Sequence, residues 1–140
     1  MDDIALAKQC RDTMYNADAA LRALDISVEI TAAGCAEAHF VVRRDMINGH
    51  GVCHGGCLFT LADTAFAYAC NSYNKVTLAA GASIEFLRAA KLGDNIVAIA
   101  TERHRGRRSG FYDVVVRNQD GVELALFRGR SHSMREALFT

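Results

Sequence analysis

Residues 48–70 read NGHGVCHGGCLFTLADTAFAYAC and join a glycine-rich loop to an apolar segment. The loop holds four glycines within eight residues, so bare backbone amides can approach a ligand there: Gly49, Gly51, Gly55 and Gly56. The apolar run after the loop predicts a helix. We therefore expect a helix whose N-terminus opens onto a ligand-binding loop.

A single acid interrupts this helix. Between Arg44 and Lys75 there is no lysine or arginine, and after Asp45 the only acid is Asp63. A carboxylate in an apolar helix is costly unless it is hydrogen-bonded, neutralised or open to a wet cleft. The polar residues of the helix fall on one narrow stripe, namely Thr60, Asp63, Thr64 and Asn71. An exposed helix face would also accommodate Asp63, but its combination with the glycine loop favours a functional site.

Length and composition limit the classes of protein. A chain of 140 residues suits one domain, residues 1–140. Hydrophobic residues make up 51%, and Lys+Arg equals Asp+Glu at 16 each, which argues against disorder and against nucleic-acid binding. No apolar run reaches the roughly 18 residues of a membrane span. Five cysteines and the absence of a signal peptide predict reduced thiols in the cytoplasm.

Periodic patterns predict a helix over residues 2–20 and six strands, at 26–31, 36–43, 76–88, 95–105, 111–118 and 123–134. The last four strands follow one another through short turns, so they are expected to pair antiparallel. The predicted fold class is α+β, with one long apolar helix packed against a curled antiparallel sheet.

Three other chemistries fit this sequence less well. A zinc site from His50, Cys53, His54 and Cys57 would need a helix through the glycines, so we expect no metal. A dinucleotide loop would need a third glycine and a βαβ unit, so we expect no cofactor. A Cys53 nucleophile would need a base, and its neighbour His54 is expected to point away from it.

Acyl chemistry fits better. The amides of Gly55 and Gly56 lie at the positive end of the helix dipole, where they could stabilise an oxyanion. Asp63 lies eight residues after Gly55, about 12 Å along a helix that rises about 1.5 Å per residue. One helix cannot present both groups to one carbonyl. Either the groups act separately, or two antiparallel helices pair Gly55 of one chain with Asp63 of the other in a symmetric dimer.

The whole chain resembles the hotdog-fold acyl-CoA thioesterases, and in particular the PaaI-like branch of phenylacetate degradation. The motifs that carry this resemblance are Asn48-x5-His54-Gly55-Gly56, Leu61-Ala62-Asp63, Ile84 to Arg88, Gly93-Asp94, Arg108 to Asp113 and Phe127 to His132. One departure is Ala89, where the family often has proline.

The resemblance implies a hotdog dimer, usually doubled into a homotetramer. It further implies that Asp63 activates water or attacks the thioester, that the Gly55 amide polarises the carbonyl, and that Asn48 and His54 shape the pocket. The residues implied in substrate or CoA binding are Gly56, Thr64, Arg107, Arg108 and Ser109.

The resulting hypothesis is hydrolysis of an acyl-CoA, with hydroxylated phenylacetyl-CoA or a similar aryl-acetyl-CoA favoured. Two alternatives remain open. A hotdog hydroxyacyl-thioester dehydratase would yield an enoyl product instead of free thiol, and a non-catalytic acyl-CoA-binding protein would bind without hydrolysis.

Overall fold

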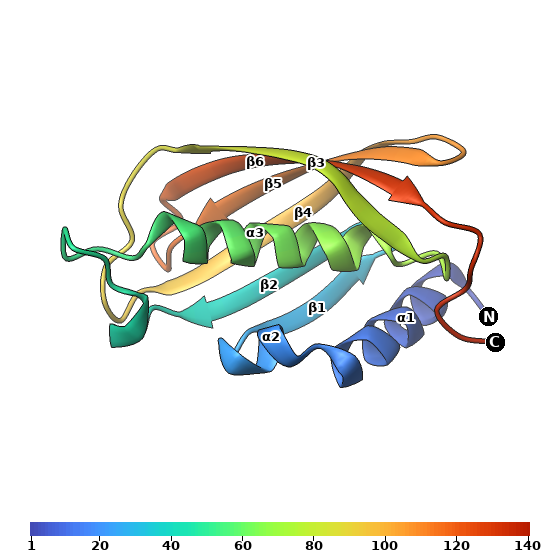
Figure 1. Cartoon of the computed structure of the whole chain (residues 1–140), viewed down its shortest axis with the longest axis horizontal. Coiled ribbons are helices and arrows are strands. Elements are labelled where there is room, and N and C mark those ends of the chain that lie inside the picture. The colour runs from blue at the N-terminus through green and yellow to red at the C-terminus, as the bar shows by residue number, and fades with distance from the viewer.

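The long apolar segment forms α3 (Gly55–Cys70), which lies against the concave face of a six-stranded sheet (Figure 1). The structure is a computed structural model that describes residues 1–140. The elements before α3 are α1 (Asp3–Ala17), α2 (Ala19–Ala23), β1 (Ser27–Ala32), β2 (Cys35–Val41) and the 3-10 turn η1 (Arg44–Met46). Those after it are β3 (Thr77–Phe86), β4 (Asn95–Arg105), β5 (Ser109–Arg117) and β6 (Glu123–Ser133).

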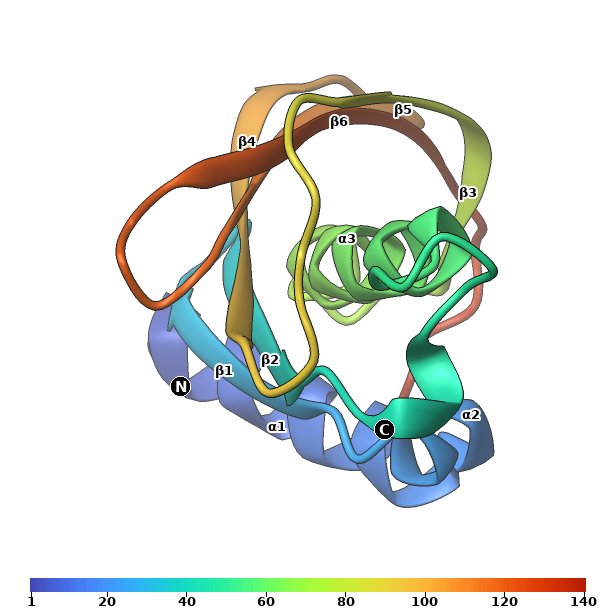
Figure 2. The same ribbon diagram turned by 90° about the vertical axis from the view of Figure 1, so that its left-hand side faces the viewer.

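The sheet is antiparallel throughout, in the order β1-β2-β4-β5-β6-β3. Figure 2 looks along α3 and shows the sheet curling around it. The α+β class, the antiparallel pairing and the six strands are all as predicted, and this arrangement is the hotdog fold. The predicted strand bounds differ from the observed ones by no more than two residues at either end.

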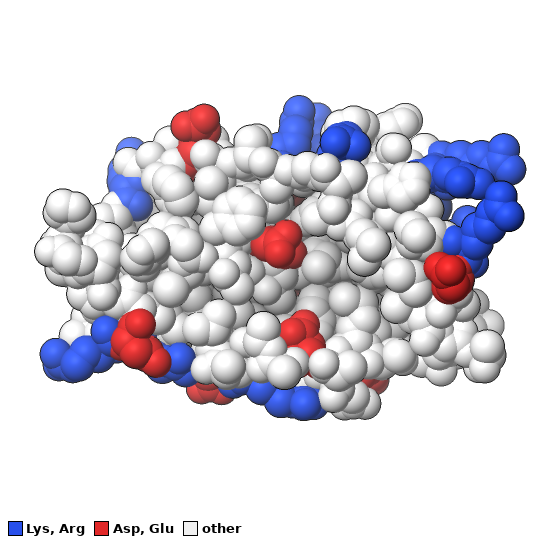
Figure 3. All heavy atoms as spheres, viewed as in Figure 1, with Lys and Arg blue, Asp and Glu red and all other residues white.

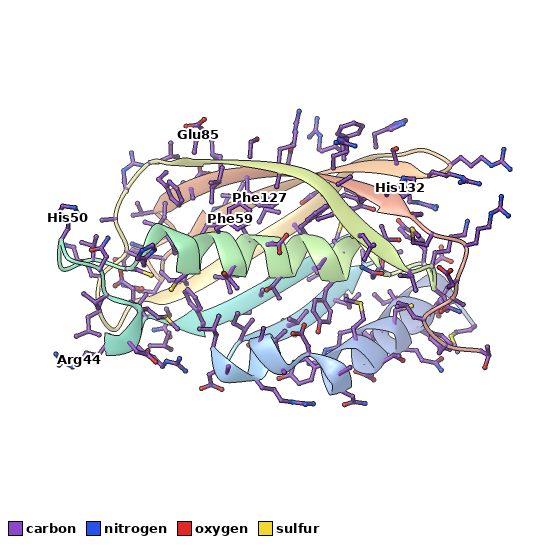
Figure 4. The ribbon with its side chains drawn as sticks, in the orientation of Figure 1. Arg44, His50, Phe59, Glu85, Phe127 and His132 are labelled. Carbon is purple, nitrogen blue, oxygen red and sulfur yellow. The ribbon has the colours of Figure 1, made fainter.

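Small side chains allow α3 to lie close to the sheet. The strands in front of it bury Ala36 and Ala38 from β2 and Ala98 and Ala100 from β4, each fully inaccessible to solvent. Larger side chains fill the space towards β5 and β6, where Figure 4 shows Phe59 of α3 beside Phe127 of β6, with ring centroids 5.4 Å apart. The size of the side chains on the inner face of the sheet therefore sets the height of the helix above it.

At one position a side chain of the helix packs directly on the backbone of the sheet. A Cβ atom added at Gly129 in β6 would lie 2.7 Å from the ring of Phe66, which is 1% exposed. The ring of Phe66 also packs against those of Tyr112 and Phe127, at 5.6 and 5.9 Å between centroids. Glycine is therefore required here because the aromatic ring has no room to move.

The predicted first helix is wrong in one respect, because it is two helices. The chain breaks at Asp18, whose carboxylate accepts a hydrogen bond from the Leu21 amide at 3.2 Å and caps α2. The same carboxylate accepts the hydroxyl of Tyr68 in α3 at 3.0 Å. A contact between residues so far apart in sequence leaves no mark in the local periodicity.

The edge strand β3 is unusually open for its length. Of its ten residues only Thr77 is buried, and its outer edge has no strand partner within the chain. Such an edge carries a row of unpaired N–H and C=O groups and readily pairs with another chain. No helix is both long and apolar enough to cross a bilayer.

Candidate functional site

The loop before α3 is held together by the side chain of Asn48. Its Oδ1 accepts hydrogen bonds from the amides of His50 at 2.9 Å and Val52 at 3.3 Å. Gly51 within this turn has a φ of +80°, a conformation that suits glycine. Figure 4 shows His50 at the tip of the loop, away from α3. Asn48 therefore shapes the loop from within.

His54 is the N-cap residue of α3. Its Nδ1 accepts the amide hydrogen of Gly56 at 3.0 Å, so the neutral ring carries its proton on Nε2. The expectation that both glycine amides are available to a ligand is therefore wrong for Gly56. The amide of Gly55 has no acceptor within the chain and remains the open donor at the helix N-terminus.

Asp63 lies in the middle of α3, on the polar stripe with the partly exposed Thr60 and Thr64. It is half-buried, and no hydrogen bond or ion pair within the chain involves its carboxylate. Burial raises the pKa of Asp63 above its ordinary value, because the charged form loses hydration. A half-buried acid without a partner costs stability in the isolated chain, which supports a functional reason for it.

Two threonines flank Asp63 on the predicted polar stripe. The hydroxyl of Thr60 donates to the Gly56 carbonyl at 2.9 Å, and that of Thr64 donates to the Thr60 carbonyl at 2.7 Å. Their oxygen lone pairs remain free to accept a hydrogen bond. Both side chains are partly exposed beside Asp63, so this part of the stripe is as predicted.

The fourth member of the stripe, Asn71, was predicted wrongly. It follows the last residue of α3, is 4% exposed, and donates to the carbonyls of Ala67 at 2.8 Å and Thr77 at 2.9 Å. Its Oδ1 accepts the Thr77 amide at 2.9 Å. Asn71 therefore joins the end of α3 to the start of β3, because the helical spacing no longer applies beyond the last turn.

A mostly apolar cleft of about 410 Å³ opens beside the N-terminus of α3. Phe86, at the end of β3, lies over the helix start: a Cβ at Gly55 would be 3.0 Å from its ring. The other residues that line the cleft are Val52, Cys53, Gly55, Leu58, Leu87, Arg88 and Ala89. Phe86 was not predicted as a site residue, because strand alternation does not tell which helix residue the end of a strand will meet.

The cysteines of this region are not activated. Burial, together with the neighbouring Cys57, raises the pKa of Cys53 to about 12, so its thiol is protonated at neutral pH. Its sulfur contacts the carbonyl of His54 at 3.7 Å instead of the imidazole. The interpretation of Cys53 as a structural thiol therefore agrees with its surroundings. One group of side chains has potential metal-ligand atoms within 4.8 Å of one another, and it lies away from the glycine loop, on β1 and β2: Glu29, Glu37 and His39.

The basic residues proposed for CoA lie at the other end of the helix. Arg107 and Arg108 form the turn between β4 and β5, Ser109 begins β5, and all three are exposed. A small polar pocket joins this turn to Cys70, the last residue of α3. Figure 3 shows lysines and arginines gathered at this end of the molecule. Within one chain, therefore, the structure does not bring these arginines to Gly55.

Comparison with known proteins shows the family of this chain. The model of the family described as "Thioesterase superfamily" matches residues 50–125, from the glycine loop to the start of β6. The chain belongs to the thioesterase superfamily. This thioesterase is 46% identical over 126 residues, 90% of each chain, to the acyl-coenzyme A thioesterase PaaI of Escherichia coli strain K12.

Solved structures of other thioesterases share the fold. The structure of the E. coli PaaI protein from the phenylacetic acid degradation operon matches with a TM-score of 0.95 and 43% identity, covering 97% of this thioesterase and 99% of that chain. A hypothetical thioesterase from Streptococcus pneumoniae TIGR4, solved with coenzyme A, matches with a TM-score of 0.80 and 25% identity, covering 91% and 98%.

Proposed function

We propose that this thioesterase hydrolyses an acyl-CoA to the free acid and CoA. The similarity to an acyl-coenzyme A thioesterase over 90% of both chains supports this activity. The favoured substrate is an aryl-acetyl-CoA, such as hydroxylated phenylacetyl-CoA. The apolar cleft beside Gly55, with the ring of Phe86 in its wall, is suited to an aryl group.

One observation carries the mechanism: α3 holds two groups that lack partners and are too far apart to act together. The Gly55 amide lies at its first residue and Asp63 eight residues later, about 12 Å along the axis. We therefore propose a homodimer with antiparallel α3 helices, in which Gly55 of one subunit faces Asp63 of the other. The open edge of β3 and the largely uncharged face around α3 (Figure 3) support such pairing.

In each composite site the thioester carbonyl oxygen accepts a hydrogen bond from the Gly55 amide, which stabilises negative charge in the transition state. The carboxylate of Asp63 either removes a proton from water or attacks the carbonyl carbon itself. When Asp63 acts as a base, the water oxygen adds to the carbonyl carbon, the C–S bond breaks, and the CoA sulfur leaves as a thiol with the proton that Asp63 took from water. When Asp63 acts as a nucleophile, its oxygen adds to the carbonyl carbon, the C–S bond breaks to leave a mixed anhydride, and the thiolate takes a proton from solvent. A water molecule then hydrolyses the anhydride, which releases the free acid and restores the carboxylate. His54 and Asn48 keep the Gly55 amide in place through the helix cap and the loop turn.

The proposed assembly is a homodimer doubled into a homotetramer. The five cysteines are all free, which supports a reducing compartment such as the cytoplasm.

Substituting Gly55 by proline tests the amide directly. Proline is well tolerated at the first residue of a helix, and the ψ of 133° at His54 suits the residue before a proline. Gly55→Ala is the matched control, because it also adds a Cβ atom beside the ring of Phe86 but keeps the N–H. We expect kcat of Gly55→Pro to be about 10²–10³ times lower than that of Gly55→Ala.

Asp63→Asn tests the acid. Release of free thiol measures thioester hydrolysis, and an assay for enoyl product separates it from the dehydratase alternative. Turnover should be lost while the oligomer survives. Equal rates for the proline and alanine variants, or full CoA release by Asp63→Asn, would contradict the mechanism.

A further inference from the structure

The outer face of the β1–β2 hairpin carries two carboxylates and one imidazole close together. Glu29 of β1 lies directly opposite Glu37 of β2 in the antiparallel register, and His39 follows two residues later on the same face of β2. One potential ligand atom from each side chain lies within 4.8 Å of the other two. We call these three residues the hairpin cluster: Glu29, Glu37 and His39.

The hairpin cluster faces away from α3. Ala36, Ala38 and Phe40 alternate with its members along β2 and are buried in the core between the sheet and the helix. Successive side chains of a strand point to opposite faces of the sheet, so Glu37 and His39 lie on the face that α3 does not cover. An ion held there would therefore lie apart from the candidate active site of the same subunit.

The two carboxylates of the cluster have no arginine or lysine partner. Like charges directly opposite each other on neighbouring strands destabilise the pair. The single ion-pair contact of Glu37 is with His39, whose Nε2 lies 3.6 Å from Oε1 of the glutamate. Glu29 forms no ion pair. The folded hairpin therefore places two negative charges together without a permanent positive one.

The neighbouring elements do not supply the missing charge. On β4, the residues paired with the cluster are apolar, with Val97 opposite His39 and Ile99 opposite Glu37. On α1, Arg11 reaches the backbone of β1, but its Nη1 pairs with Asp12 at 3.0 Å. A cation from solution would relieve the repulsion that these neighbours leave in place.

The donor atoms limit which cation this is. An imidazole nitrogen together with two carboxylate oxygens suits Zn²⁺ and similar first-row divalent metals, whereas Mg²⁺ prefers oxygen ligands alone. Three protein ligands around Zn²⁺ leave a fourth position for water. A pocket of about 240 Å³ shares His39 with the cluster and also contains Ser27, which pairs with His39 across the strands. It offers room for that water.

We propose that the hairpin cluster binds one Zn²⁺ or similar first-row divalent cation per subunit, and that this ion joins β1 to β2 at the edge of the sheet. Shared coordination replaces the repulsion between Glu29 and Glu37 and stabilises the hairpin. The site is separate from thioester hydrolysis and does not depend on the proposed function.

Calorimetry with Zn²⁺ alone, on protein freed of metal by a chelator, tests the site. We expect the wild type to bind one Zn²⁺ per subunit, and Glu37→Gln and His39→Gln to bind it at least about tenfold more weakly. Mg²⁺ should bind far more weakly than Zn²⁺. The matched controls are Glu85→Gln and His132→Gln, which remove the same kinds of ligand from exposed positions on β3 and β6 (Figure 4) and should bind as the wild type does.

Thermal unfolding separates metal binding from an ordinary structural role of these side chains. Without metal, Glu37→Gln should have a Tm equal to or above that of the wild type, because it removes one of two opposed charges. With saturating Zn²⁺ the wild type should become the more stable protein, since it alone gains the binding free energy.

Three outcomes would overturn the proposal. The first is a wild type that binds no Zn²⁺. The second is Zn²⁺ binding of unchanged affinity in both Glu37→Gln and His39→Gln. The third is loss of the Zn²⁺ site in His50→Gln, which would place the ion at the glycine loop instead.

Discussion

Asp63 determines the pH dependence that we expect of this enzyme. In the proposed mechanism its carboxylate is the active form, and burial raises the pKa of the group above the ordinary value of 3.8. As pH falls, Asp63 therefore takes up its proton at a higher pH than an exposed aspartate would. We predict an acid limb in kcat/KM lying above 3.8, measured by thiol release across a series of buffers.

The same pKa shift predicts how the stability of the fold depends on pH. A raised pKa means that the folded state favours the protonated acid, so this contribution is present at acid pH and is lost as pH rises through the folded-state pKa. At neutral pH, Asp63→Asn should therefore have a higher Tm than the wild type, and the difference should shrink in acid. A lower Tm at neutral pH would show that the carboxylate has a stabilising partner.

The sequence alone was enough to single out Asp63 and Gly55, because an isolated acid and a glycine before an apolar run are visible in the residue order. The hydrogen bond from the Gly56 amide to His54 could not be predicted from the sequence. It depends on the rotamer of His54, whose Nδ1 turns back to the second amide of the helix. Asn71 was wrongly predicted to lie on the polar stripe of the helix for a similar reason, since its hydrogen-bond partner Thr77 belongs to another element.

The contact between α3 and β6 depends on Gly129. Gly129→Ala would place a Cβ 2.7 Å from the ring of Phe66, which is held by Tyr112 and Phe127. Overpacking of this kind costs about 1–3 kcal/mol. We predict a Tm lowered by roughly 3–10 °C in thermal unfolding.

Gly49→Ala is the control for that substitution, because a Cβ there meets nothing within 4 Å. Its Tm should match that of the wild type. If Gly129→Ala were as stable as this control, the helix would have room to move away from the sheet.

The predicted bounds of β4, residues 95–105, match the observed ones, because turn residues flank the strand on both sides. The break between α1 and α2 was missed, since Asp18 ends the helix through its contacts with Leu21 and Tyr68. Phe86 was missed as a site residue for a related reason. Its contact with Gly55 arises only when β3 packs alongside α3.

The order of strands was also beyond prediction. β3 pairs with β6, the last strand in the sequence, and so becomes the edge of the sheet. Alternating hydrophobicity fixes which face of a strand is buried but leaves its neighbours undetermined. The open edge that favours a dimer was therefore visible only once the fold was assembled.

Mixing two inactive variants tests whether the site is shared between subunits. Asp63→Asn keeps the Gly55 amide, and Gly55→Pro keeps the acid, so a mixed dimer holds one intact composite site. Random pairing of equal amounts should recover about a quarter of the wild-type activity. The measurement is thiol release after the two variants are unfolded and refolded together.

Each variant refolded alone is the control, and both should stay inactive. Absence of recovery, with mixed dimers present by mass spectrometry, would mean that both groups act within one subunit.

In the proposed dimer, one rigid helix carries the amide of one site and the acid of the other, so a subunit that separates from its partner takes half of each site with it. Catalysis would then depend on the square of the subunit concentration once the enzyme is diluted below its dissociation constant. Specific activity, usually a constant of an enzyme, would here fall on dilution and would report the fraction of subunits that are assembled.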